Sequence, residues 1–202
     1  GDRFGHQGKA QLEAVMQAAE DGLDITPVWN KSNREHTIIG TRPADVRREA
    51  DDAVRACRWQ GAYFVDADHI SLSSVDAFIE SSDFFTLDVA DFIGKGSAEA
   101  DVEAFVEKYA KYAGSFAVAG IDQTFKISVE LVRAAAEKYL SVVREAGRIY
   151  RHIEAAKGRG NFITEVSMDE TDQPQTPVEM LFILAAVADE GIPAQTIAPK
   201  FS

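Results

Sequence analysis

Two carboxylates and an imidazole follow a short apolar run in the segment Tyr63-Phe64-Val65-Asp66-Ala67-Asp68-His69-Ile70. Such a run is typical of a strand buried on both faces, as in a parallel sheet. These polar groups are costly to remove from water at the end of a strand unless they are paired or bind a cation. Asp66, Asp68 and His69 therefore predict a site for a divalent metal, a proton relay, or both. The alternative is that an aspartate caps the next helix and His69 lies on the surface.

A second acidic position lies in the apolar run Phe162–Met168, which also reads as a strand. At a period of two, Glu165 shares one face with Ser167 and Asp169. Glu165 has apolar neighbours, so its carboxylate needs a cation or a hydrogen-bond partner there. An ion pair with a neighbouring Lys or Arg is the alternative.

Residues suited to hold an anionic substrate occur near both ends of the sequence. Lys200 follows the last expected strand, although a solvated lysine is the plainer interpretation. Arg3 lies in the glycine-rich stretch Gly1–Gly5, whose backbone is suited to contact an anion. Asp88 ends another apolar run and is interpreted first as a turn cap, while its membership of the site stays open.

One histidine among several carboxylates fits a hard or borderline divalent ion such as Mn²⁺, Zn²⁺ or Co²⁺. It does not fit a closed structural zinc site, which uses four cysteine or histidine ligands. A metal of this kind polarises a carbonyl and stabilises an enediolate. This is the chemistry of sugar isomerases, epimerases and metal-dependent aldolases. His36 and His152 lie in polar surroundings and are expected at the surface.

Composition narrows the class of protein. A net charge of −12 argues against nucleic acid and against an anionic membrane surface as partners. A small anionic substrate stays open, because a local pocket can be positive on an acidic protein. Cys57 is the single cysteine, so no intrachain disulfide is expected, and the longest apolar run, Leu181–Ala188, is far too short to span a bilayer. We therefore expect a cytoplasmic protein.

The elements that must position these residues alternate between strand and helix, which predicts an α/β fold with a parallel sheet. Strands are expected at residues 25–29, 62–66, 84–87, 116–121, 162–168 and 194–198, and helices at 9–21, 44–59, 73–81, 98–112, 127–157 and 177–189. The long helix has a candidate break at Gly147. Both a doubly wound sheet and part of a (β/α)₈ barrel are compatible with this order. No Gly-x-Gly-x-x-Gly follows a strand, which argues against dinucleotide binding.

Four blocks of the sequence resemble those of the tagaturonate/fructuronate epimerases, bacterial enzymes of hexuronate catabolism. The blocks are Gly1-Asp2-Arg3-Phe4-Gly5, Phe64–Ile70, Glu165–Thr171 and Gln195–Phe201. The resemblance implies a metal-dependent isomerase with a (β/α)₈ TIM-barrel-like fold that interconverts D-tagaturonate and D-fructuronate, with a small sugar acid as its partner. A homo-oligomer stays open. Because family members are about twice as long, we expect residues 1–202 to form a single α/β domain of a longer barrel, incomplete in this chain.

The two sugar acids differ at a carbon whose hydroxyl is β to the ketone, so retro-aldol cleavage and re-addition can invert that carbon. Following the resemblance, we assign His69 and Glu165 as metal ligands and Asp68 as the base or a third ligand. Asp66 would orient these groups.

The substrate carboxylate would be held by Lys200 and Arg3. Three alternatives are left open by the residues: a class II-type aldolase, another sugar isomerase on the same barrel, and a catalytically silent fragment. An oxidation–reduction route is disfavoured because the sequence has no nicotinamide-binding motif.

Overall fold

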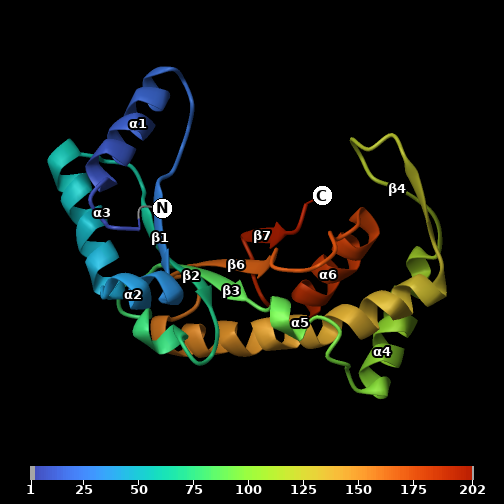
Figure 1. Ribbon diagram of the computed structural model, residues 1–202. Coiled ribbons are helices and arrows are strands. Elements are labelled where there is room, and N and C mark those ends of the chain that lie inside the picture. The colour runs from blue at the N-terminus through green and yellow to red at the C-terminus, as the bar shows by residue number, and fades with distance from the viewer. Residues whose placement is uncertain (1–2, 202) are drawn as a thin grey trace. The chain divides into compact units, whose positions relative to one another are not determined.

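A computed structural model describes residues 3–201 (Figure 1). Its α-helices are α1 (Gly8–Glu20), α2 (Asn33–Ile39), α3 (Pro43–Cys57), α4 (Glu99–Tyr109), α5 (Val129–Lys157) and α6 (Pro177–Asp189). Its strands are β1 (Val28–Ser32), β2 (Phe64–Ile70), β3 (Phe84–Asp88), β4 (Gly114–Ala117), β5 (Thr124–Ile127), β6 (Ile163–Met168) and β7 (Thr196–Pro199). Short 3₁₀ helices occur at Val75–Ala77, Ala90–Phe92 and Ala110–Tyr112.

The chain divides into two compact units. One unit runs to Leu87 and adds Ile149–Glu165, and the other combines Asp88–Arg148 with the stretch from Val166 onward. Each unit is described by itself. The prediction that residues 1–202 form a single domain stays a prediction.

The larger sheet has the strand order β1-β2-β3-β6-β7. The β1–β2 and β2–β3 pairings are parallel. The other two strands, β4 and β5, form a separate antiparallel hairpin. The alternation of strands with helices and the parallel pairings confirm the predicted α/β class.

In the first unit, α1 and α3 cover one face of β1 and β2 (Figure 1). The core between them contains Leu12 from α1, Val46 from α3, Trp29 from β1 and Val65 from β2, all buried. Because side chains alternate along a strand, the neighbours of Trp29 and Val65 point to the opposite face. The polar Asp66 therefore lies on the face that these helices do not cover.

The structure corrects the expected ends of two strands. β2 continues to Ile70 rather than ending at Asp66, because pairing with β1 carries the ladder through Ser32 and Asp68. Asp66, Asp68 and His69 thus lie on the strand itself and not after it. β1 likewise begins at Val28 instead of Ile25.

Helix α2 was not predicted. Its N-cap is Ser32, whose side chain accepts a hydrogen bond from the amide of Glu35, while the Glu35 carboxylate accepts one from the Ser32 amide. This capping box starts a helix in a polar stretch. His36 lies on its inner face and is buried, so the surface prediction for His36 was wrong.

Other expectations had mixed outcomes. The capping box Thr176–Glu179 at the start of α6 is confirmed. The helix expected at residues 73–81 is only the single 3₁₀ turn Val75–Ala77. The long helix α5 passes through Gly147 without a break, and His152 is exposed on it, as predicted. Within residues 3–201, no helix is both long and apolar enough to cross a membrane. A cytoplasmic location and a homo-oligomer stay predictions.

Candidate active site

The register of β2 and β3 is fixed at their N-terminal ends by Asp83. Its carboxylate accepts a hydrogen bond from the amide of Val65 (2.7 Å) and pairs with the Arg47 guanidinium (2.7 Å). Its amide donates to the carbonyl of Val65 (3.0 Å), and its carbonyl accepts from the amide of Ile163 at the start of β6. These contacts hold three strands side by side, one residue before Asp66 on β2 and two residues before Glu165 on β6.

Asp66 is the buried centre of the site. Only 6% of the residue is exposed, and its Oδ1 has no hydrogen-bond partner among residues 3–201. Burial of the carboxyl, helped by the negative charges of Asp68 and Glu165, raises the pKa of Asp66 to about 7. The hydrogen bond from Thr86 opposes this shift but does not cancel it. The pKa of Asp66 therefore lies near neutral pH, where the carboxyl can both take up and release a proton.

Thr86 of β3 lies between Asp66 and Glu165. Its Oγ1 is 3.0 Å from Oδ2 of Asp66 and 3.3 Å from Oε1 of Glu165. The structure thus brings together two of the predicted catalytic carboxylates. Among residues 3–201, the partner that the structure gives Glu165 is this hydroxyl.

Asp68 and His69 form the second pair of the site. Nδ1 of His69 lies 2.8 Å from Oδ1 of Asp68, and both side chains are partly exposed. The β2–β3 register shifts between Ala67 and Ile70, and His69 has φ +50°. A non-glycine residue in the left-handed region is strained, and bulges of this kind redirect side chains next to active sites. The backbone is thus bent at the predicted metal ligand.

The negative charge and the oxygen donor atoms of the acidic side chains around Asp66 suit a hard divalent ion. Asp66 has an unpaired buried oxygen, and one hydroxyl hydrogen serves two carboxyl groups. However, within the described part of the chain no three His, Cys, Asp or Glu side chains are grouped so that they could hold a metal ion. The residues present thus supply the charge that attracts a cation but not an assembled set of ligands.

Arg3 lies in a loop that folds over α3. Its Nε is 3.9 Å from Oε1 of Glu35, and its side chain is largely exposed. Gly5 has φ +67°, and a Cβ on it would lie 2.9 Å from Oε2 of Glu49. Glu49 also accepts a hydrogen bond from the amide of Gly8 (2.8 Å). The glycines of this loop therefore permit close approach to Glu49, while Gly1 and Asp2 lie outside the described residues.

Lys200 belongs to the second unit. Its amide donates to Oε1 of Gln175 (2.7 Å), and Nε2 of Gln175 donates to the carbonyl of Met168 (3.3 Å). Gln175 therefore ties the end of β6 to the end of β7 and fixes the backbone at Lys200. Sequence reasoning missed Gln175, which lies in a polar loop without a recognisable motif. The role of Lys200 toward a substrate stays a prediction.

Two acidic side chains that follow strands of the second unit, Asp88 and Asp169, take part in local hydrogen bonds. Oδ1 of Asp88 accepts a hydrogen bond from the amide of Ala90 (3.3 Å), which is the turn-capping role predicted first. The hydroxyl of Ser167 donates to Oδ1 of Asp169 (2.7 Å). Whether Asp88 also takes part in the site stays open.

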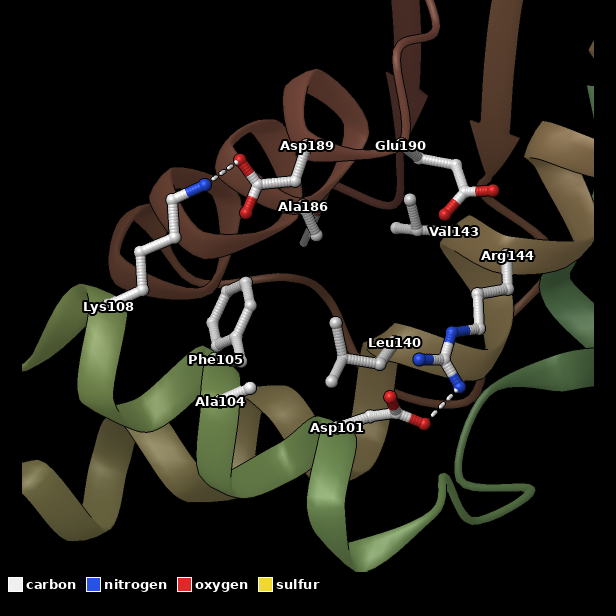
Figure 2. A pocket seen from close by; sticks show the side chains of 10 residues that line it. All are labelled: Asp101, Ala104, Phe105, Lys108, Leu140, Val143, Arg144, Ala186, Asp189 and Glu190. Carbon is white, nitrogen blue, oxygen red and sulfur yellow. Dashed lines mark hydrogen bonds and ion pairs between the residues drawn. The ribbon is translucent and has the colours of Figure 1, made fainter.

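The second unit contains a hollow of about 230 Å³ lined by residues of α4, α5 and α6 (Figure 2). Lys108 pairs with Asp189 (2.6 Å) and Arg144 with Asp101 (2.7 Å) at its rim. Figure 2 shows apolar side chains such as Leu140 between these pairs. Because both cations already have carboxylate partners, this hollow is a packing feature of α4, α5 and α6.

Comparison with known proteins places these residues in a family. The family model of tagaturonate epimerase (UxaE) matches residues 1–202. The tagaturonate/fructuronate epimerase of Thermotoga maritima is 25% identical over 214 residues, covering all of this chain and 43% of the relative.

Solved structures of fructuronate-tagaturonate epimerase from Cohnella laeviribosi have the same fold. The glycerol complex matches with a TM-score of 0.79 at 20% identity, and the native structure with a TM-score of 0.74 at 23% identity. Each match covers the whole chain and 43% of the solved one, so the chain spans less than half the length of these relatives. Since the family model matches the chain along its whole length, the chain belongs to the tagaturonate epimerase family.

Proposed function

We propose that this chain takes part in the interconversion of D-tagaturonate and D-fructuronate. The observation that carries the proposal is the match of the tagaturonate epimerase family to residues 1–202. The names of the Thermotoga and Cohnella relatives support the same pair of substrates. The acidic side chains of β2 and β6, with Asp66 buried and Glu165 partly buried, are the proposed location of this chemistry.

We also propose that the larger sheet is part of a (β/α)₈ barrel. Its strands follow one another in chain order, apart from the separate hairpin of β4 and β5. A doubly wound sheet would instead reverse its strand order at a switch point. A barrel also places polar residues at the C-terminal ends of its strands, where β2 carries Asp68 and His69.

The proposed reaction is a retro-aldol cleavage followed by re-addition. A base removes the proton of the hydroxyl on the carbon β to the ketone. The bond between this carbon and the α carbon breaks, the β carbon becomes an aldehyde, and the electron pair of the broken bond forms an enediolate with the ketone. The released aldehyde turns and is attacked on its other face, and the proton returns to the new alkoxide. The hydrogen on the inverted carbon is never removed.

Three carboxyl groups are proposed to carry out the proton transfers. Asp68 acts as the base, because it is partly exposed and the His69 imidazole fixes its orientation. Asp66 and Glu165 share the Thr86 hydroxyl, so a proton can be held between them. Arg3 and Lys200 are proposed to hold the substrate carboxylate.

A divalent ion such as Mn²⁺, Zn²⁺ or Co²⁺ is proposed as cofactor, with His69 and Glu165 as its ligands from this chain and Asp68 as a third ligand only if it does not act as the base. When bound, such an ion supplies positive charge that polarises the ketone. The support for it is the cluster of incompletely neutralised carboxylates around Asp66.

An isotope experiment tests the reaction directly. D-tagaturonate carrying deuterium at the carbon to be inverted is incubated with the protein, and D-fructuronate is followed by ¹³C NMR. We expect product that retains the deuterium, with a rate ratio near one against unlabelled substrate. Loss of deuterium to water would indicate deprotonation, and a rate ratio of several-fold would indicate hydride transfer. No fructuronate at all would contradict the proposed function.

A further inference from the structure

Thr86 occupies the strand between the two that carry the acidic residues. It lies on β3, which has β2 on one side and β6 on the other. Only 2% of Thr86 is exposed, and its hydroxyl contacts both Asp66 and Glu165. A central, fully enclosed hydroxyl thus connects carboxyl groups that are 99 residues apart in the sequence.

The hydroxyl has one hydrogen for two acidic neighbours. It can donate to Asp66 or to Glu165 at a given moment, and its lone pairs can accept from whichever carboxyl is protonated. Oγ1 of Thr86 lies 3.0 Å from Oδ2 of Asp66 and 3.3 Å from Oε1 of Glu165. When both carboxyl groups are ionised, the hydroxyl can donate to only one of them; when one is protonated, the hydroxyl can accept from that one and donate to the other. In either case the orientation of each carboxyl depends on the other through Thr86.

A purely structural role would leave a different pattern. Buried threonine hydroxyls commonly bond to a nearby backbone carbonyl, which satisfies the side chain locally. Thr86 bonds instead to two side chains on neighbouring strands, one of which keeps an unpaired buried oxygen. For packing alone, valine would fill the same volume without placing a polar atom between two acids.

We propose that Thr86 is a positioning residue of the site: its hydroxyl holds the Asp66 and Glu165 carboxyl groups in their working orientation. The effect of Thr86 on catalysis rests on the proposed function. Its hydrogen bonds to Asp66 and Glu165 do not depend on that function. Thr86 touches neither the substrate nor the reacting atoms in this account. It acts through the two carboxyl groups that it joins.

The test compares Thr86→Val, which keeps the shape and removes the hydroxyl, with Thr86→Ser, which keeps the hydroxyl. Thr124→Val, an exposed threonine on β5, is the control for the same chemical change. For epimerisation we expect kcat of Thr86→Val to fall about 10- to 100-fold with KM within about twofold, as for other groups that orient site residues. Thr86→Ser should stay within about threefold of the wild type, because it preserves the hydrogen bond.

A second readout does not depend on turnover. The side-chain carboxyl ¹³C shifts of Asp66 and Glu165 are recorded at one pH in each variant. Both should move in Thr86→Val and stay near their wild-type values in Thr86→Ser and Thr124→Val. If both shifts and kcat are unchanged in Thr86→Val, the inference is wrong.

Folding failure and functional failure give separate results. If Thr86→Val does not fold, Thr86→Ser and Thr86→Ala replace it as a pair that differs by one hydroxyl, and equal shifts and rates in that pair overturn the inference. If wild-type protein does not epimerise tagaturonate, the proposed function fails, while the carboxyl shifts still decide whether Thr86 orients the two acids.

Discussion

Nδ1 of His69 lies 2.8 Å from Oδ1 of Asp68, the residue directly before it on β2. Adjacent residues of a regular strand point to opposite faces, so they do not normally meet in this way. The contact becomes reachable because the ladder to β3 is irregular here and His69 has φ +50°. Backbone strain thus accompanies the pairing of a predicted base with a predicted metal ligand.

The strain at His69 predicts an unusual order of variant stabilities. His69→Gly should have a free energy of unfolding about 1 kcal/mol higher than His69→Ala, because glycine accepts a positive φ without steric cost. The matched pair is His152→Gly and His152→Ala on α5, where alanine should be the more stable by about 1 kcal/mol. Urea unfolding measures all four. Equal stability of the two His69 variants would show that its backbone is not strained.

Asp66 predicts a stability that depends on pH. Its pKa is raised to about 7 in the folded protein, so between about pH 4 and 7 the folded state binds more protons than the unfolded state. The contribution of Asp66 to stability is therefore present at low pH and is lost as pH rises through 7. Asp66→Asn cannot ionise and should be more stable than wild type at pH 8 by about 1–4 kcal/mol.

Urea unfolding of Asp66→Asn at pH 5 and pH 8 measures this difference. Asp24→Asn, an exposed loop position, is the control and should follow the wild type at both values. A difference between Asp66→Asn and wild type that does not grow with pH would contradict the raised pKa of Asp66.

His36 predicts the opposite dependence at lower pH. Burial, and secondly the positive charge of Lys31, lower the pKa of His36, while Asp45 and Glu35 oppose the shift. Because the folded-state pKa lies below the unfolded value, His36 stabilises the protein above about pH 6.5, and this contribution is lost as pH falls. His36→Gln should show a shallower loss of stability between pH 7 and 5 than His152→Gln. Identical slopes would contradict the prediction.

The N-terminal loop predicts a steric clash when Gly5 is replaced. Both Gly5 and Gly22 have positive φ, but only at Gly5 would a Cβ meet another residue, Oε2 of Glu49 at 2.9 Å. Gly5→Ala should therefore lower the free energy of unfolding by about 1–2 kcal/mol more than Gly22→Ala. Thermal unfolding of the two variants side by side measures this. Equal losses would show that the loop moves away from Glu49 at no cost.

Much of the sheet could be predicted because its strands contain short apolar runs, although the ends of β1 and β2 were misjudged. The runs at β3 and β6 were located correctly, as was the capping box of α6, while β2 was found but extends four residues beyond its expected end. Helix α2 was missed although Ser32 and Glu35 carry a capping-box signal, because its residues are polar and short helices lack periodicity. His36 was misplaced for the same reason.

The site was only partly visible in the sequence. Asp66, Asp68, His69 and Glu165 could be selected because acids in apolar strands are costly without a partner. Thr86 could not, because a threonine in the run Phe84–Asp88 is an ordinary strand residue until the neighbouring strands are known. The strain at His69 could not be predicted either, since it depends on the register between β2 and β3.

The most direct test of the account is the rate of tagaturonate epimerisation in Glu165→Gln against Glu107→Gln, an exposed position on α4 that undergoes the same chemical change. Fructuronate formation is followed by ¹³C NMR with Mn²⁺ present. The carboxylate site on β2 and β6 predicts a loss of at least about 100-fold in Glu165→Gln and a wild-type rate in Glu107→Gln. Wild-type turnover in both variants would contradict it.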